Sequence, residues 1–108
     1  EYFAAGRIQF LKTCLDKLKF APSKAIDFGC GTGTSVPLLH QLPGVKKVTG
    51  TDLSVESIAQ AQQLYAHPDR PFITLTDFKP QGDFDLAFCN GVFHHRQMRP
   101  LSARWKIF

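Results

Sequence analysis

The chain has 108 residues, of which 44% are hydrophobic and 20% charged, so it is long enough for one small domain and too apolar to be disordered. Its net charge is +4, with basic segments before residue 25 and after residue 95 and an acidic segment between them. No apolar run approaches the roughly 20 residues of a membrane span. The three cysteines form no CxxC pair. We therefore expect no membrane contact, disulfide framework or metal site, and a cytoplasmic location.

The basic ends of the chain allow two interpretations. They can contact nucleic acid or another anionic surface. They can also be solvated helix faces and a solvated tail. We favour solvated surfaces and expect no nucleic-acid partner, because no aromatic side chains are interleaved with the basic ones.

Hydrophobic periodicity predicts helices and strands that alternate along the chain. Helices are expected over residues 7–19 and 35–42, and from an N-cap at Ser54 to about Ala66. Strands are expected over residues 24–28, 46–51, 72–76 and 84–89. Alternation of this kind predicts an α/β fold, a Rossmann-like parallel sheet of order 3-2-1-4 with flanking helices. Ligands of such sheets bind at the carboxyl ends of the strands, here between strands 1 and 4.

A glycine-rich turn follows the first predicted strand. Its spacing is D-x-G-x-G-x-G, formed by Asp27, Gly29, Gly31 and Gly33. Glycines permit a tight turn and let a ligand approach the backbone. The dinucleotide fingerprint requires glycine at position 34, where this chain has Thr34, so pyrophosphate binding is disfavoured. A tight strand-to-helix turn without a ligand explains the same glycines, and this alternative stays open.

Acidic residues end the next two predicted strands. Asp52 follows the second strand, and a carboxylate at this position can accept hydrogen bonds from both ribose hydroxyls. Asp77 follows the third strand beside Phe78, and together they can bind the amino edge and the face of an adenine. The alternatives are a helix N-terminal acid for Asp52 and a turn residue for Asp77.

Four segments in order carry a resemblance to a known family. AIDFGCGTGTSVPLL, VTGTDLS, TLTDF and FDLAFCNGVFHH, all within residues 24–95, are similar to successive motifs of class I S-adenosylmethionine-dependent methyltransferases. The nearest likeness is to the small-molecule enzymes of the broad "methyltransferase domain" group. The resemblance implies S-adenosylmethionine as cofactor.

The resemblance also implies which residues bind that cofactor. Asp27 matches the acid that holds the methionine ammonium, and Asp52 matches the acid of the ribose. The remaining matches are Gly29, Cys30, Gly31 and Gly33 in the loop, Leu53, Asp77 and Phe78 around the adenine, and Asn90 and Gly91 beside the methionine and the sulfonium. Transfer itself needs no proton chemistry, so positioning supplies most of the catalysis.

His94 and His95 are the only candidates for a catalytic role. One of them can act as a base on a substrate hydroxyl or shape the acceptor pocket. Neighbouring residues on a helix point in different directions, so they do not form a metal pair. We favour a structural pair at a helix start, one buried and one solvated. Cys30 and Cys89 are expected to be inert core residues.

The resemblance stops near residue 96. We expect a single partial domain over residues 1–108: an N-terminal helix over 1–23, a cofactor-binding core over 24–95 and a basic tail of unclear structure over 96–108. The sheet is expected to end before the last three strands of the family, as a fragment or a natural truncation. Strand 4 is then an open apolar edge, through which the chain can self-associate.

The leading hypothesis is methyl transfer to a small molecule, with this chain supplying the cofactor-binding half. An Asn-Pro-Pro-aromatic segment, typical of nucleic-acid methyltransferases, is absent after strand 4, where the chain has Asn90-Gly91-Val92-Phe93. Two alternatives remain: a non-catalytic truncated fold that acts as an interaction module, and a dinucleotide-binding oxidoreductase domain.

Overall fold

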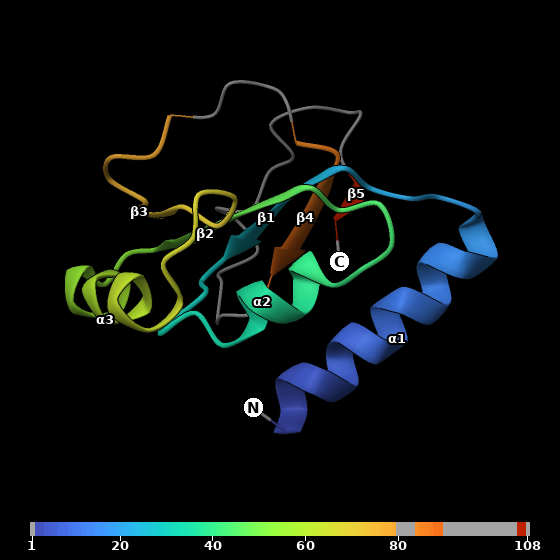
Figure 1. Cartoon of the computed structure of the whole chain (residues 1–108), viewed down its shortest axis with the longest axis horizontal. Coiled ribbons are helices and arrows are strands. Elements are labelled where there is room, and N and C mark those ends of the chain that lie inside the picture. The colour runs from blue at the N-terminus through green and yellow to red at the C-terminus, as the bar shows by residue number, and fades with distance from the viewer. Residues whose placement is uncertain (1, 80–83, 90–105, 108) are drawn as a thin grey trace.

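The structure is a computed structural model that describes residues 2–79, 84–89 and 106–107 (Figure 1). Helices and strands alternate along it, as predicted. The elements are α1 (Tyr2–Leu18), β1 (Lys24–Phe28), α2 (Ser35–His40), β2 (Lys47–Asp52), α3 (Val55–Tyr65), β3 (Phe72–Thr74), β4 (Leu86–Cys89) and β5 (Lys106–Ile107). No helix in these described ranges has the length and apolar character needed to cross a membrane.

The strands form one parallel sheet in the order β3-β2-β1-β4-β5. The predicted order 3-2-1-4 is confirmed. The expected open edge at β4 is wrong over Leu86 and Ala87, because these residues pair with Lys106 and Ile107 of β5. The sheet therefore extends one strand further than expected, and the basic tail contains that strand. A strand of two residues has no periodicity to detect, so the sequence could not predict it.

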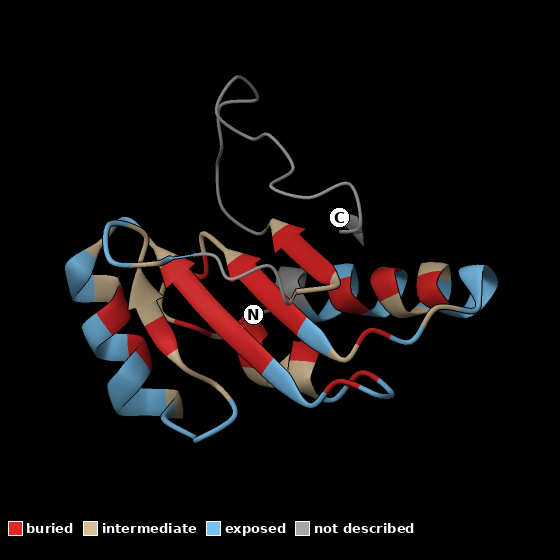
Figure 2. Cartoon of the chain, turned by 90° about the horizontal axis from the view of Figure 1, so that it is seen from above, coloured by how far each residue is buried: buried red, intermediate tan, exposed pale blue. Residues whose placement is uncertain are grey.

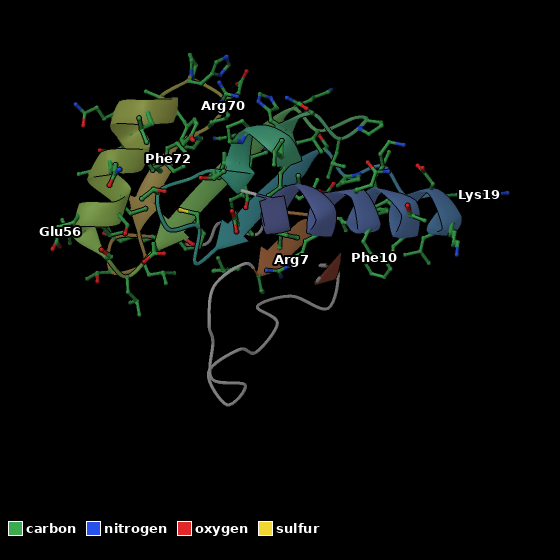
Figure 3. All side chains as sticks on the ribbon, turned by 90° about the horizontal axis from the view of Figure 1, so that it is seen from below. Arg7, Phe10, Lys19, Glu56, Arg70 and Phe72 are labelled. Carbon is green, nitrogen blue, oxygen red and sulfur yellow. The ribbon has the colours of Figure 1, made fainter. Side chains whose placement is uncertain are left out.

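The three helices lie on the same face of the sheet (Figures 1 and 3). They meet β1, β2, β3 and β4 in one continuous apolar core. Leu11 of α1 is 1% exposed and Leu39 of α2 is fully buried. Burying each of these leucines contributes roughly 1.5–3 kcal/mol to stability. This helix-covered face provides most of the packing that holds the strand ends in place.

The opposite face of the sheet carries a smaller apolar cluster. Ile26 and Ala87 are buried there, and three phenylalanines pack against them. The rings of Phe28 and Phe78 meet edge to face with centroids 6.3 Å apart, and the centroid of Phe84 lies 6.0 Å from that of Phe78. Figure 2 shows the central strands buried along most of their length. Both faces of the central strands are therefore covered.

Local signals fix several element ends. The Ser54 side chain accepts a hydrogen bond from the Ser57 amide at 3.1 Å, which confirms the predicted N-cap of α3. Lys19 has a φ of 53°, the left-handed conformation that ends a helix, and α1 stops just before it. The third strand is shorter than predicted, because the amides of Asp77 and Phe78 both turn back to the carbonyl of Thr74. Asp77 therefore lies in a turn after β3 and not at the strand end.

Candidate cofactor site

The glycine-rich loop after β1 is tied to the end of β2 by three successive backbone amides. Gly29 and Cys30 both donate to the carbonyl of Thr51, at 2.8 and 2.9 Å. Gly31 donates to Oδ2 of Asp52 at 2.8 Å. The loop can follow this path because Gly29 and Gly31 adopt φ values of 73° and 57°. The loop and the carboxyl end of β2 therefore form one rigid rim.

Asp52 stands at the centre of this rim. Its Oδ2 accepts from Gly31, and its Oδ1 accepts from the Ser54 amide at 2.9 Å. Each carboxylate oxygen has two acceptor sites, so hydroxyl groups of a ligand can still bind. The side chain is partly exposed. Asp52 thus holds the loop and keeps acceptor sites that are accessible from solvent.

The glycines of the loop divide into two kinds. Among the described residues, a Cβ on Gly31 would meet nothing within 4 Å, so this position faces open space. A Cβ on Gly33 would lie 2.8 Å from Cε1 of Phe72 and 3.0 Å from Cβ of Ala61. Gly50 of β2 faces the same ring, with a distance of 2.7 Å to its Cδ1. Gly31 suits close approach of a ligand, whereas Gly33 and Gly50 make room for Phe72.

Asp27 is the most unusual side chain of the site. It is fully buried near the carboxyl end of β1, and neither carboxylate oxygen has a hydrogen-bond partner among the described residues. Burial raises the pKa of Asp27 well above its ordinary value, the charge of Arg7 lowers it, and the charge of Asp52 raises it further. Burying a carboxylate without partners costs several kcal/mol unless a proton or a nearby cation neutralises it.

Arg7 is the residue that sequence reasoning missed. It extends from α1 across the end of the sheet, where its Nη2 donates to the carbonyl of Cys89 at 2.7 Å (Figure 3). Its guanidinium carbon lies 5.1 Å from the ring centroid of Phe88, within cation–π range. The one available signal was its position four residues before the buried Leu11, which places both residues on the sheet-facing side of α1.

The residues assigned to the adenine differ in their surroundings. Leu53 is 75% exposed directly after Asp52, which leaves an apolar surface open beside the rim. Asp77 is exposed in its turn. Phe78 packs against Phe28 and Phe84 on the face of the sheet opposite α1, α2 and α3. Four further predicted site residues lie outside the described residues: Asn90, Gly91, His94 and His95.

The thiols near the site are poor nucleophiles. Burial, followed by the charges of Asp27 and Asp52, raises the pKa of Cys30 to about 12. Burial also raises the pKa of Cys89. Raised pKa values favour the protonated thiols, which are poor nucleophiles. Cys30 is buried as expected for a core residue, whereas Cys89 is only partly buried. Within the described ranges no group of three or more His, Cys, Asp or Glu side chains can hold a metal ion.

Comparison with known sequences gives one family. The family described as "Methyltransferase domain" matches residues 26–105. A trans-aconitate 2-methyltransferase of Escherichia coli O1:K1 / APEC is 41% identical over 92 residues, covering 82% of this chain and 36% of that protein. Its counterpart in Escherichia coli O157:H7 is 34% identical over 95 residues, with the same coverage of 82% and 36%. The chain thus spans about a third of the length of these relatives.

Solved structures agree on the fold. The plantazolicin methyltransferase BpumL, in complex with a pentazolic desmethylPZN analog and SAH, superimposes with a TM-score of 0.61 at 23% identity, over 79% of this chain and 34% of its own. CalS10, a SAM-bound amino pentose methyltransferase from Micromonospora echinaspora, gives a TM-score of 0.63 at 19% identity, over 81% of this chain and 36% of its own.

Proposed function

Because the chain belongs to the class I S-adenosylmethionine-dependent methyltransferases, we propose that it is the cofactor-binding part of an enzyme that methylates a small molecule. The observation that carries this proposal is Asp27, a fully buried carboxylate with no hydrogen-bond partner among the described residues. The α-ammonium of S-adenosylmethionine is a cation that such a group can bind. The residues present therefore fit the cofactor.

Each end of the cofactor has a matching group on the rim. Asp27 would hold the methionine ammonium, and the open backbone at Gly31 would admit the ligand. Asp52 would accept the ribose hydroxyls, and the exposed Leu53 would cover one face of the adenine. The other residues proposed to surround the cofactor are Gly29, Cys30, Gly33, Asp77, Phe78, Asn90 and Gly91.

The cofactor, when bound, supplies an electrophilic methyl group on a sulfonium. Positioning by the protein would supply most of the catalysis, because an acceptor would have to be held in line with that methyl group. The task of Asp27, Asp52 and the loop is to hold the ligand in one orientation. His94 and His95 remain the candidates for deprotonating an acceptor hydroxyl.

The proposed acceptor is a small molecule. The curated relatives reported above are named for trans-aconitate, and BpumL and CalS10 are described with a plantazolicin analog and as an amino pentose methyltransferase. All three cysteines are free thiols, which supports the proposed cytoplasmic location.

The test is calorimetric titration of the chain with S-adenosylhomocysteine. We expect micromolar binding, which Asp52→Ala weakens by about 1–3 kcal/mol because a charged hydrogen-bond acceptor is lost. Thermal unfolding of the same variant separates loss of ligand contacts from loosening of the loop, since Asp52 also holds Gly31. Asp69→Asn changes an exposed acid and serves as the matched control. A folded wild-type chain that binds NAD in place of S-adenosylhomocysteine contradicts the proposal.

A further inference from the structure

We infer that the amino end of the sheet carries a second binding site, for an oxyanion of the phosphate class. The site is formed by Arg70, just before β3, together with His67 in the same turn and His40 at the end of α2. The proposed cofactor site lies at the other end of the strands. The inference is therefore independent of the proposed function and adds a second ligand to it.

The first support is the direction of the Arg70 side chain. The amides of Val48 and Gly50 donate to carbonyls of the segment that leads into β3, both at 2.9 Å. This ladder places Arg70 opposite Val48, as Phe72 is opposite Gly50. Successive side chains of an extended chain alternate between the two faces of a sheet. Arg70 therefore points to the same face as Phe72, which belongs to the core under the helices (Figure 3).

The second support is the guanidinium of Arg70. Its Nε is buried and has no hydrogen-bond partner among the described residues. Asp69, its neighbour in the sequence, forms no ion pair with it. A buried donor without an acceptor destabilises a fold. An oxyanion would provide acceptors for this donor and for the other N–H groups of the same guanidinium, in charge-assisted hydrogen bonds.

The third support is a pair of imidazoles beside Arg70. The amide of Arg70 donates to the carbonyl of His67 at 3.0 Å, so both residues belong to one turn. The ring of His40 lies against that of His67, with centroids 5.8 Å apart. His40 is the last residue of α2, so the pair lies on the helix-covered side. The guanidinium and the two imidazoles thus share one side of the sheet at its amino end.

The hydrogen bonding of His67 indicates the class of ligand. Its Nδ1 accepts from the Asp69 amide at 3.0 Å. The proton of the neutral ring is therefore on Nε2, which is a donor in this tautomer and offers no lone pair to a metal ion. A donor of this kind next to a guanidinium fits an anion that carries several acceptor oxygens. Phosphate, free or as a phosphomonoester, has this chemistry.

The experiment measures binding of inorganic phosphate to the 108-residue chain by calorimetry at neutral pH. Arg70→Met keeps an unbranched stem for packing and removes the charge and the donors. His40→Phe keeps a ring against His67 and removes the ring nitrogens. Lys47→Met removes an equal charge at the same end of the sheet. Alternation along β2 directs Lys47 to the face opposite Val48, so this variant is the matched control.

We expect the wild-type chain to bind phosphate with a dissociation constant of about 1 mM or lower. Arg70→Met should weaken binding by about tenfold or more, because charge-assisted hydrogen bonds are lost, and His40→Phe should weaken it severalfold. Lys47→Met should change it by about twofold or less, since solvent and salt screen a charge on the other face. Tighter binding of glycerol 3-phosphate than of phosphate supports a phosphomonoester as the ligand, and equal binding supports phosphate itself.

Three results overturn the site. These are a folded wild-type chain that does not bind phosphate, equal weakening by Arg70→Met and Lys47→Met, and displacement of phosphate by S-adenosylhomocysteine. Arg70 then serves only to pack its stem beside the core. If Arg70→Met does not fold, the difference between His40→Phe and Lys47→Met decides the question.

Discussion

Two aspartates at opposite ends of neighbouring strands differ in whether backbone amides bind their carboxylates. At the amino end of β4, the carboxylate of Asp85 accepts from the Ser23 amide at 2.9 and 3.2 Å and from the Lys24 amide at 3.0 Å. Asp27, nearer the carboxyl end of β1, has no partner for either oxygen in the described part of the chain. The fold can saturate a carboxylate with backbone amides where only structure is at stake. The lack of such partners at Asp27 among the described residues supports the proposed ligand site at this end of the sheet.

Substitutions in the glycine-rich loop should distinguish Gly33, which makes room for Phe72, from Gly31, which faces open space. Gly33→Ala is expected to lower the free energy of unfolding by about 2–5 kcal/mol, because the new Cβ meets Phe72 and the backbone is left-handed. Gly31→Ala is expected to cost only about 1–2 kcal/mol, since its Cβ meets open space. Urea denaturation measures both. Equal losses would mean that the open space at Gly31 is absent in solution.

Loss of the Asp85 carboxylate, which accepts from two backbone amides, is expected to have the next largest effect on stability. Asp85→Ala removes the acceptor of the Ser23 and Lys24 amides, and we expect a loss of stability of about 1.5–3 kcal/mol. Affinity for S-adenosylhomocysteine should stay unchanged in the folded fraction, because Asp85 lies at the opposite end of the sheet. Denaturation and calorimetry on the same preparation test both statements. If Asp85→Ala has normal stability and weakened binding, Asp85 serves the ligand and the comparison with Asp27 is wrong.

Loss of the charge at Asp27 is expected to raise the stability of the chain instead of lowering it. Asp27→Asn is expected to raise the stability of the ligand-free chain by about 1–2 kcal/mol at pH 7, because an ionisable group no longer has to be buried without a partner. The same variant should lose most of its affinity for S-adenosylhomocysteine. Gains in stability that come with lost binding are the mark of a functional residue.

The pH dependence of this stability difference checks its cause. The folded-state pKa of Asp27 is raised, so the wild-type chain loses no stability below the ordinary aspartate pKa of about 3.9. Its stability then falls as the pH rises toward the folded-state pKa, since the unfolded chain ionises first. The advantage of Asp27→Asn should therefore shrink as the pH is lowered to about 4. A constant advantage at all pH values would point to packing instead of charge.

Local patterns predicted the parts of the molecule that depend on local physics. The Ser54 cap, the strand β1 and the glycine turn each have a signature within a few residues, and the structure places them as expected. Three features needed contacts between distant residues. Arg7 reaches Cys89 across 82 positions, β5 pairs through two residues only, and the role of Gly33 depends on the ring of Phe72. No spacing rule contains such information, so these features came from the structure alone.

The three amides that tie the loop to β2 have a consequence for how the site responds to a ligand. The nucleoside end would bind at Asp52, and the amino-acid end would bind at Asp27, just before the loop. Because Gly29, Cys30 and Gly31 donate to Thr51 and Asp52, the loop cannot shift without moving the ribose acceptor. We therefore expect adenosine and methionine not to bind independently to the loop and the end of β2. Both ends of the proposed ligand would contact this one connected unit, so we expect a ligand bound at one end to strengthen binding at the other end.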